Sequence, residues 1–203
     1  MEKFYYAFLI TLLFGSWSSA QIIYSDQFED TLTTDSNSAY DVRIENGSLI
    51  IDGNGTAGAY NAFEYKVHAE GDSVAFDMTE NPRIFIRAKA NGPGVLRVDA
   101  KDAAGYVTNL SAKYATLTED FAVYTLDFAD DFNDGGFGGS PCESADAPCP
   151  VNPSEISSLV FFVDDATGGY AGTVEIDWIS VGEPLEGDSM EEESGDLIYS
   201  DGF

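Results

Sequence analysis

Basic residues are scarce in this sequence. Nine Lys and Arg stand against 36 Asp and Glu, which gives the 203-residue chain a formal net charge of −27 at pH 7. Nucleic acids and anionic membrane surfaces bind proteins through Lys and Arg, so neither is an expected partner. Histidine is almost absent, because His68 is the only one. A catalytic Tyr/His/Arg cluster is therefore not expected, and no histidine stands near the cysteines to complete a zinc site.

Long apolar runs are also missing. The longest, residues 4–15, has twelve residues, whereas a membrane-spanning helix needs about 20. Lys3 precedes this run and Ser18-Ser19-Ala20 follows it. This pattern predicts that residues 1–20 are a secretory signal peptide. We therefore expect a mature chain that starts at Gln21 and is secreted or held at the cell surface.

No stretch after residue 20 keeps a 3.6-residue apolar period. Short alternating runs recur instead between clusters of Gly, Asn, Asp and Pro, which is typical of strands. The predicted strands are residues 22–28, 41–45, 48–52, 58–67, 73–77, 83–90, 94–101, 106–112, 121–128, 157–164 and 172–182. About ten strands without helices predict an all-β fold, an antiparallel β-sandwich of the jelly-roll type over residues 21–183.

Only two cysteines are present, Cys142 and Cys149, and both lie in a proline-rich part of the long predicted loop 129–155. In an oxidising compartment two cysteines this close in sequence are expected to form a disulfide bond. Such a bond closes a small loop and removes little chain entropy. We expect it to stiffen a surface loop.

The end of the chain repeats its beginning. Residues 197–203 (LIYSDGF) match residues 22–28 (IIYSDQF) at five of seven positions. Residues 184–196 are acidic and poor in apolar side chains, as linkers are. We therefore expect an acidic linker at 184–196 and the start of a second, truncated repeat at 197–203. Chance similarity between two short strands is the alternative. Further modules of the same chain are the expected neighbours, and the unit is expected to be a monomer.

Two neighbouring predicted strands place four of the eight basic residues of residues 21–203 on one outward face. Residues 83–90 and 95–101 alternate apolar and polar side chains around the turn Asn91–Gly94. If they form a hairpin with both apolar sets inward, the outward neighbours are Lys89 and Arg97, Arg87 and Asp99, and Phe85 and Lys101. This face is either a set of structural ion pairs or a polar groove for hydroxyls or carboxylates.

The last predicted strand changes its inward face. Val174 and Ile176 share one parity, whereas Ile179 and Val181 share the other. This switch predicts a bulge or kink between Asp177 and Trp178. A carboxylate at such a kink is a candidate ligand for a structural cation.

The strand GTVEIDWISVG (172–182) resembles the closing strand of galactose-binding-like β-sandwiches, the fold of many carbohydrate-binding modules. Phe28-Glu29-Asp30 is similar to their first strand. The resemblance implies a non-catalytic module that binds a polysaccharide or another glycan. It also implies one structural calcium ion, held by Asp177 and by Glu29 with Asp26 or Asp30, with carbonyl oxygens completing the shell.

Sugar binding requires flat aromatic faces beside fixed polar groups. The expected carbohydrate-binding residues are Trp178, Tyr106, Tyr60, Arg87, Arg97, Asp99 and Asn109, and further aromatic candidates are Tyr65, Tyr114 and Tyr170. Trp178 ranks first because it is the only Trp after residue 20. The alternative function is a structural or adhesion spacer that binds no glycan.

A catalytic role is not expected. Glu175-Ile176-Asp177 resembles the start of the E-x-D-x-x-E signature of laminarinase-type glycoside hydrolases. The companion position of the second glutamate, Ile179 or Ser180, is not acidic.

Overall fold

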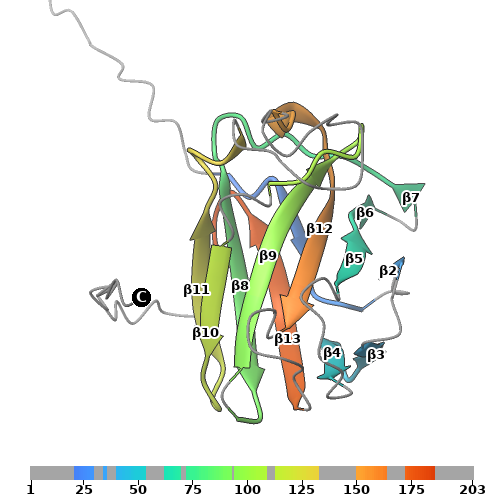
Figure 1. Ribbon diagram of the computed structural model, residues 1–203, viewed down its shortest axis with the longest axis vertical. Helices are drawn as coiled ribbons and strands as arrows, with labels where there is room; N and C mark the ends of the chain where they lie inside the picture. Colours follow the sequence, from blue (N-terminus) through green and yellow to red (C-terminus); the bar gives the residue numbers. More distant parts are fainter. Residues whose placement is uncertain are drawn as a thin grey trace, which may run out of the picture.

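The computed structural model describes residues 21–29, 34–35, 40–53, 62–69, 72–92, 94–108, 113–132, 150–163 and 172–185. These residues form two antiparallel sheets packed face to face, so the predicted β-sandwich is confirmed (Figure 1). No helix among them is long and apolar enough to cross a membrane. The predicted signal peptide, most of the acidic linker and the second repeat lie outside the described residues and stay predictions.

The first sheet, sheet A, has six strands. In order they are β11 (Ala122–Asp127), β8 (Arg83–Ala90), β13 (Thr173–Val181), β4 (Ser48–Gly53) and β3 (Tyr40–Glu45), with β1 (Tyr24–Asp26) also paired to β13. The edge of β13 opposite β8 is shared, because β4 pairs with Thr173–Ile176 and β1 with Ile179–Val181. β13 is therefore paired on both sides along most of its length.

The second sheet, sheet B, has five strands. In order they are β10 (Lys113–Leu117), β9 (Gly94–Asp102), β12 (Ile156–Val163), β5 (Phe63–Lys66) and β2 (Thr34–Asp35). A separate pair is formed by β6 (His68–Ala69) and β7 (Asp72–Ser73), and a short 3₁₀-helix (Pro153–Glu155) precedes β12. The long strands of both sheets lie along roughly the same axis in Figure 1.

The core lies between the sheets and follows the predicted alternation. Alternate side chains of β8 and β9 are buried there: Ile84, Ile86, Ala88, Leu96, Val98 and Ala100. Aromatic rings fill the layer toward β5, where Phe63 and Phe161 stack with centroids 5.0 Å apart. The period of two thus sets which residues face inward on these strands.

The predicted hairpin between residues 83–90 and 95–101 is wrong, because β8 lies in sheet A and β9 in sheet B. Asn91, the residue after β8, is hydrogen-bonded to the start of β13. Asn91 N donates to Thr173 O (3.0 Å), and Thr173 N donates to Asn91 Oδ1 (2.6 Å). These bonds hold the turn as an arch between the sheets. The basic residues expected on one face are consequently divided between two opposite outer faces.

Residues 22–28, which resemble residues 197–203, contain β1, and the structure shows what their shared side chains do. Their aromatic and acidic side chains, Tyr24, Asp26 and Phe28, converge on the fully buried Tyr65 of β5. Burial raises the pKa of Tyr65, so its hydroxyl stays protonated and donates a hydrogen bond to Asp26. Tyr24 must then donate to the Tyr65 oxygen, 2.6 Å away. The sequence 197–203 has Tyr, Asp and Phe at the corresponding positions.

The two ends of the described chain lie side by side. Ile23 N donates to Val181 O at 2.8 Å. Gly182 has a φ of +93°, and a Cβ at this position would overlap the carbonyl oxygen of Gln21. A glycine is therefore required by the close approach of the entering chain as well as by the backbone conformation.

Candidate functional site

The outer face of sheet B carries a row of three side chains across three strands. Tyr114 of β10 is in register with Arg97 of β9, which is in register with Phe162 of β12. Tyr114 is 51% exposed, and the only other exposed large apolar residue in the described part of the chain is Ile22. The Arg97 guanidinium lies over the Phe162 ring, with Cζ 4.6 Å from the centroid. We call these three residues the sheet B row.

Arg97 is held by an ion pair along its own strand. Its Nη2 and Nε lie 2.9 and 3.0 Å from Oδ2 of Asp99, two residues further on the same face. Asp99 is completely buried and the Arg97 side chain is 14% exposed. The ion pair and the Phe162 ring together fix the plane of the guanidinium, so it is preorganised beside Tyr114.

A second ion pair extends the polar part of this face. Lys101 Nζ lies 2.6 Å from a Glu64 carboxylate oxygen, and Ser158 Oγ donates to the other oxygen at 2.8 Å. Lys101, Ser158 and Glu64 come from β9, β12 and β5. The outer face of sheet B therefore combines an exposed aromatic ring with fixed hydrogen-bonding groups. Such a combination suits a sugar ring, whose C–H face packs on an aromatic ring while its hydroxyls bind polar groups.

The structure divides the predicted carbohydrate-binding residues. Arg97 and Asp99 lie on sheet B, whereas Arg87 and Trp178 lie on the outer face of sheet A, opposite each other in register. The predicted bulge is confirmed, because the register between β13 and β8 shifts between Ile176 and Trp178. Trp178 is only 4% exposed, so its ring is not open for stacking on a sugar. Its ranking as first candidate is therefore not supported.

The remaining candidates are placed as follows. Tyr106 is partly buried against the core, and its backbone N donates to Asp102 Oδ1 at 2.9 Å. Tyr65 is fully buried and has the internal role described above. Tyr60, Asn109, Tyr170, Cys142 and Cys149 lie outside the described residues, so their roles and the disulfide bond stay predictions.

The expected calcium ligands do not come together. Asp26 faces the interior of the sandwich, where it accepts hydrogen bonds from Tyr65 and from Phe28 N (2.7 Å). Asp177 lies on the opposite side of sheet A, where it pairs with Arg87 at 2.5 Å. No group of three or more potential metal ligands occurs among the described residues. Asp30, the alternative ligand, lies outside the described residues, and calcium binding stays a prediction.

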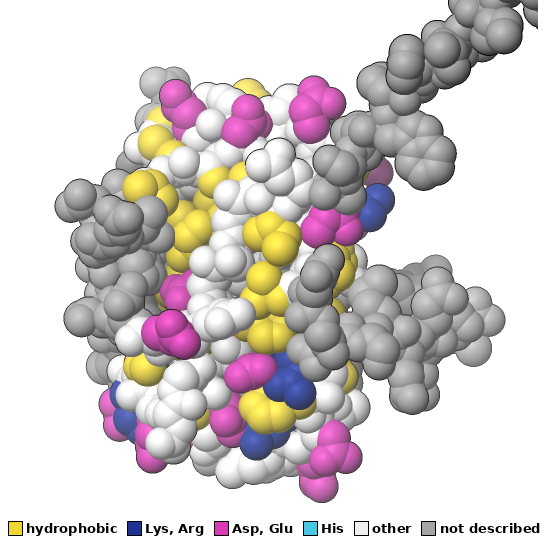
Figure 2. Space-filling view, turned by 180° about the vertical axis from the view of Figure 1, so that it is seen from behind, with side chains coloured by type: hydrophobic (Ala, Val, Ile, Leu, Met, Phe, Trp, Pro, Cys, Tyr) yellow, Lys and Arg dark blue, Asp and Glu magenta, His cyan; other side chains and the backbone are white. Residues whose placement is uncertain are grey.

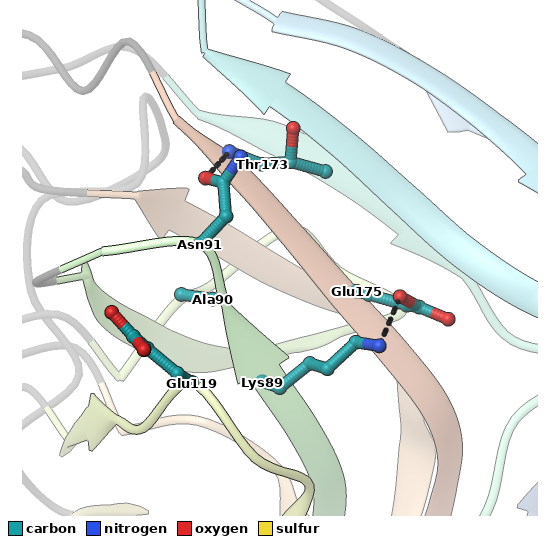
Figure 3. A pocket seen from close by; sticks show the side chains of 6 residues that line it. All are labelled: Lys89, Ala90, Asn91, Glu119, Thr173 and Glu175. Carbon is teal, nitrogen blue, oxygen red and sulfur yellow. Dashed lines mark hydrogen bonds and ion pairs between the residues drawn. The ribbon is translucent and has the colours of Figure 1, made fainter.

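A shallow depression of about 580 Å³ lies on the sheet A side. It is lined by Lys89, Ala90, Asn91, Glu119, Thr173 and Glu175 (Figure 3). Lys89 points to Glu175, with Nζ 2.9 Å from its carboxylate, and Lys89 Nζ also lies 4.3 Å from the Phe121 ring centroid. Lys89 and Asn91 thus already have partners within sheet A, and no aromatic ring is among the residues that line the depression. The sheet B row is the stronger candidate.

Tyr114 and Phe162 are not among the carbohydrate-binding residues expected from the sequence. Tyr114 was only a further aromatic candidate, since 113–117 was not among the predicted strands, although Ala115 and Leu117 alternate with it and are buried. Phe162 follows Phe161, and two consecutive strand residues face opposite sides. One of these rings therefore had to face outward, which was the available signal.

Comparisons with known proteins agree on the architecture. No family model and no curated protein matches the chain. Among solved structures, the module named BiXyn10A CBM1 superposes with a TM-score of 0.52 at 10% identity, covering 81% of this chain and 99% of that one. The low-affinity xylan-binding module CBM86 of Roseburia intestinalis gives 0.50 at 10% identity, covering 79% and 95%.

A longer chain also matches. An exo-β-agarase gives a TM-score of 0.53 at 14% identity, but this chain covers only 26% of its length while 81% of this chain is matched. At such identities the likeness concerns the fold alone. The resemblance inferred from the sequence is confirmed at that level, and the chain has the β-sandwich fold of carbohydrate-binding modules.

Proposed function

We propose that the chain is a non-catalytic glycan-binding module of a secreted, modular protein, and that the glycan lies across the outer face of sheet B. The observation that carries this proposal is Tyr114, a half-exposed ring in register with a guanidinium that is already fixed by Asp99 and Phe162. The fold is compatible with this role, and two similar structures are named as carbohydrate-binding or xylan-binding modules.

The test is retention of the protein on insoluble polysaccharides and on a glycan array, with Tyr114→Ala and Tyr114→Phe variants. We expect the alanine variant to lose about five-fold or more in affinity, because an aromatic anchor typically contributes above about 1 kcal/mol. The phenylalanine variant should keep most of the affinity, since it retains the ring. Both variants should melt close to the wild type, because the site is on the surface.

Ile22→Ala is the matched control, because Ile22 is the other exposed large apolar residue and lies outside the sheet B row. Its affinity should equal that of the wild type. Equal losses in Tyr114→Ala and Ile22→Ala would show that the row is not the site. No retention on any glycan would favour the alternative, a structural or adhesion spacer.

A further inference from the structure

The basic side chains of this protein are occupied by its own carboxylates. Residues 21–203 contain eight Lys and Arg, and all eight lie in the described part of the chain. Seven pair with an Asp or Glu: Arg43 with Asp52, Arg83 with Asp127, Arg87 with Asp177, Lys89 with Glu175, Arg97 with Asp99, Lys101 with Glu64, and Lys113 with Asp131. The eighth, Lys66, is not without a partner either.

The most buried of these pairs lies in the sheet B row, and a second pair lies on the same face. Arg97 is opposed by a carboxylate that is completely buried, and Lys101 is opposed by Glu64 at 2.6 Å. An anionic sugar that recruited Arg97 would leave Asp99 without its ion-pair partner, and an uncompensated buried charge is strongly unfavourable. Both cations can still donate hydrogen bonds to neutral hydroxyls, since this does not require breaking the pairs.

The negative charge of the rest of the molecule also disfavours anionic ligands, and it acts over a longer range. The net charge is −27, and no Lys or Arg occurs after Lys113. Blue atoms on the face shown in Figure 2 lie beside magenta ones, and no broad basic patch is visible on it. A polyanion approaching this protein is therefore repelled over roughly a Debye length, about 8–10 Å near physiological salt.

We propose that the site selects uncharged glycans and rejects glycans that carry carboxylate or sulfate groups. This rests on the proposed function, and it adds the chemical class of the ligand. Rejection has two parts, the local occupation of Arg97 and Lys101 by carboxylates and the overall negative field. Selectivity of this kind comes from repulsion of the wrong ligand as much as from attraction of the right one.

The experiment compares matched neutral and anionic glycans by affinity electrophoresis of the full chain. Suitable pairs are hydroxyethyl cellulose with carboxymethyl cellulose, arabinoxylan with glucuronoxylan, and agarose with a sulfated galactan, each at 20 and 500 mM NaCl. We expect the neutral member of the bound pair to be preferred at least ten-fold at low salt. The preference should shrink at high salt, where the long-range repulsion is screened.

A pair of charge-matched variants tests the local part. Glu64→Gln removes the carboxylate that occupies Lys101 in the site, whereas Asp127→Asn makes the same charge change beside Arg83 on sheet A. We expect Glu64→Gln to raise the affinity for the anionic member several-fold, and Asp127→Asn to change it little. Equal effects of the two variants would refute the local part.

Tighter binding of the anionic member by the wild type at low salt would overturn the whole inference while leaving glycan binding intact. Failure of all pairs to bind would instead refute the proposed function, and this inference with it. The two failures are therefore distinguishable in one set of gels.

Discussion

The pair Arg97–Asp99 gives the sharpest test of the structural reasoning. Arg97→Ala removes the partner of a carboxylate with no exposed surface. Breaking a buried pair in this way costs about 3–5 kcal/mol. The Arg97 side chain keeps 14% exposure, so water can partly replace it, and we expect the lower end of this range, about 3 kcal/mol. In a domain of this size the melting temperature should then fall by about 6–12 °C.

A double-mutant cycle with Asp99→Ala isolates the interaction energy between Arg97 and Asp99 from the other effects of each substitution. Because the double variant buries no lone charge, we expect a coupling energy of about 2 kcal/mol. The matched cycle is Arg83–Asp127, whose atoms are 3.4 Å apart and whose side chains are 51% and 53% exposed. Exposed pairs of this kind couple by less than about 1 kcal/mol.

The assay is urea unfolding followed by the fluorescence of Trp178, the only Trp in residues 21–203 and a buried one. Coupling in Arg97–Asp99 no larger than in Arg83–Asp127 would refute the argument. The prediction also has a practical consequence, because Arg97→Ala is unsuitable as a binding-site probe. A loss of glycan retention in that variant would not be separable from a loss of stability.

Two other predictions concern stability. Tyr65→Phe removes a buried hydrogen bond to the Asp26 carboxylate and should cost about 2 kcal/mol in urea unfolding; an unchanged midpoint would argue against that contact. Burial alone would raise the pKa of Asp52, but hydrogen bonds from Thr173 and Arg43 outweigh it, and the pKa is lowered overall. The stabilisation is therefore present above the unfolded pKa of about 4 and lost as pH falls through the lower folded pKa. Asp52→Asn should flatten the decrease in melting temperature below about pH 4, and an unaltered acid profile would contradict this.

Alternation in the sequence specified the inward faces but not the strand partners. Ile84, Ile86 and Ala88 point inward as expected, and the bulge at Asp177 follows from the change of parity along β13. Alternation is unchanged whether a strand pairs with its neighbour in sequence or crosses to the other sheet. The arch at Asn91 depends on its bonds to Thr173, 82 residues away, and these are not visible in local sequence.

The sequence predicted the types of residue in the candidate site, but not which strands bring them together. An arginine beside aromatic rings was expected, and Arg97 is such a residue. Its partners Tyr114 and Phe162 come from strands on either side of β9, so their meeting requires the strand order of sheet B. Conversely, Trp178 is buried although it is outside the core cluster, and parity alone does not predict this.

The adjacency of Ile23 and Val181 has a mechanical consequence. β1 and β13 are antiparallel, and the chain enters the first and leaves the second at the same end of the sandwich. Tension applied through residues 21 and 185 would therefore load the hydrogen bonds of this pair one after another, beginning with Ile23 N to Val181 O. Strands pulled in this geometry unzip at low force, whereas strands pulled from opposite ends share the load. A copy of this module that is linked to neighbours at both ends would release β1 under modest tension and lengthen the tether between them.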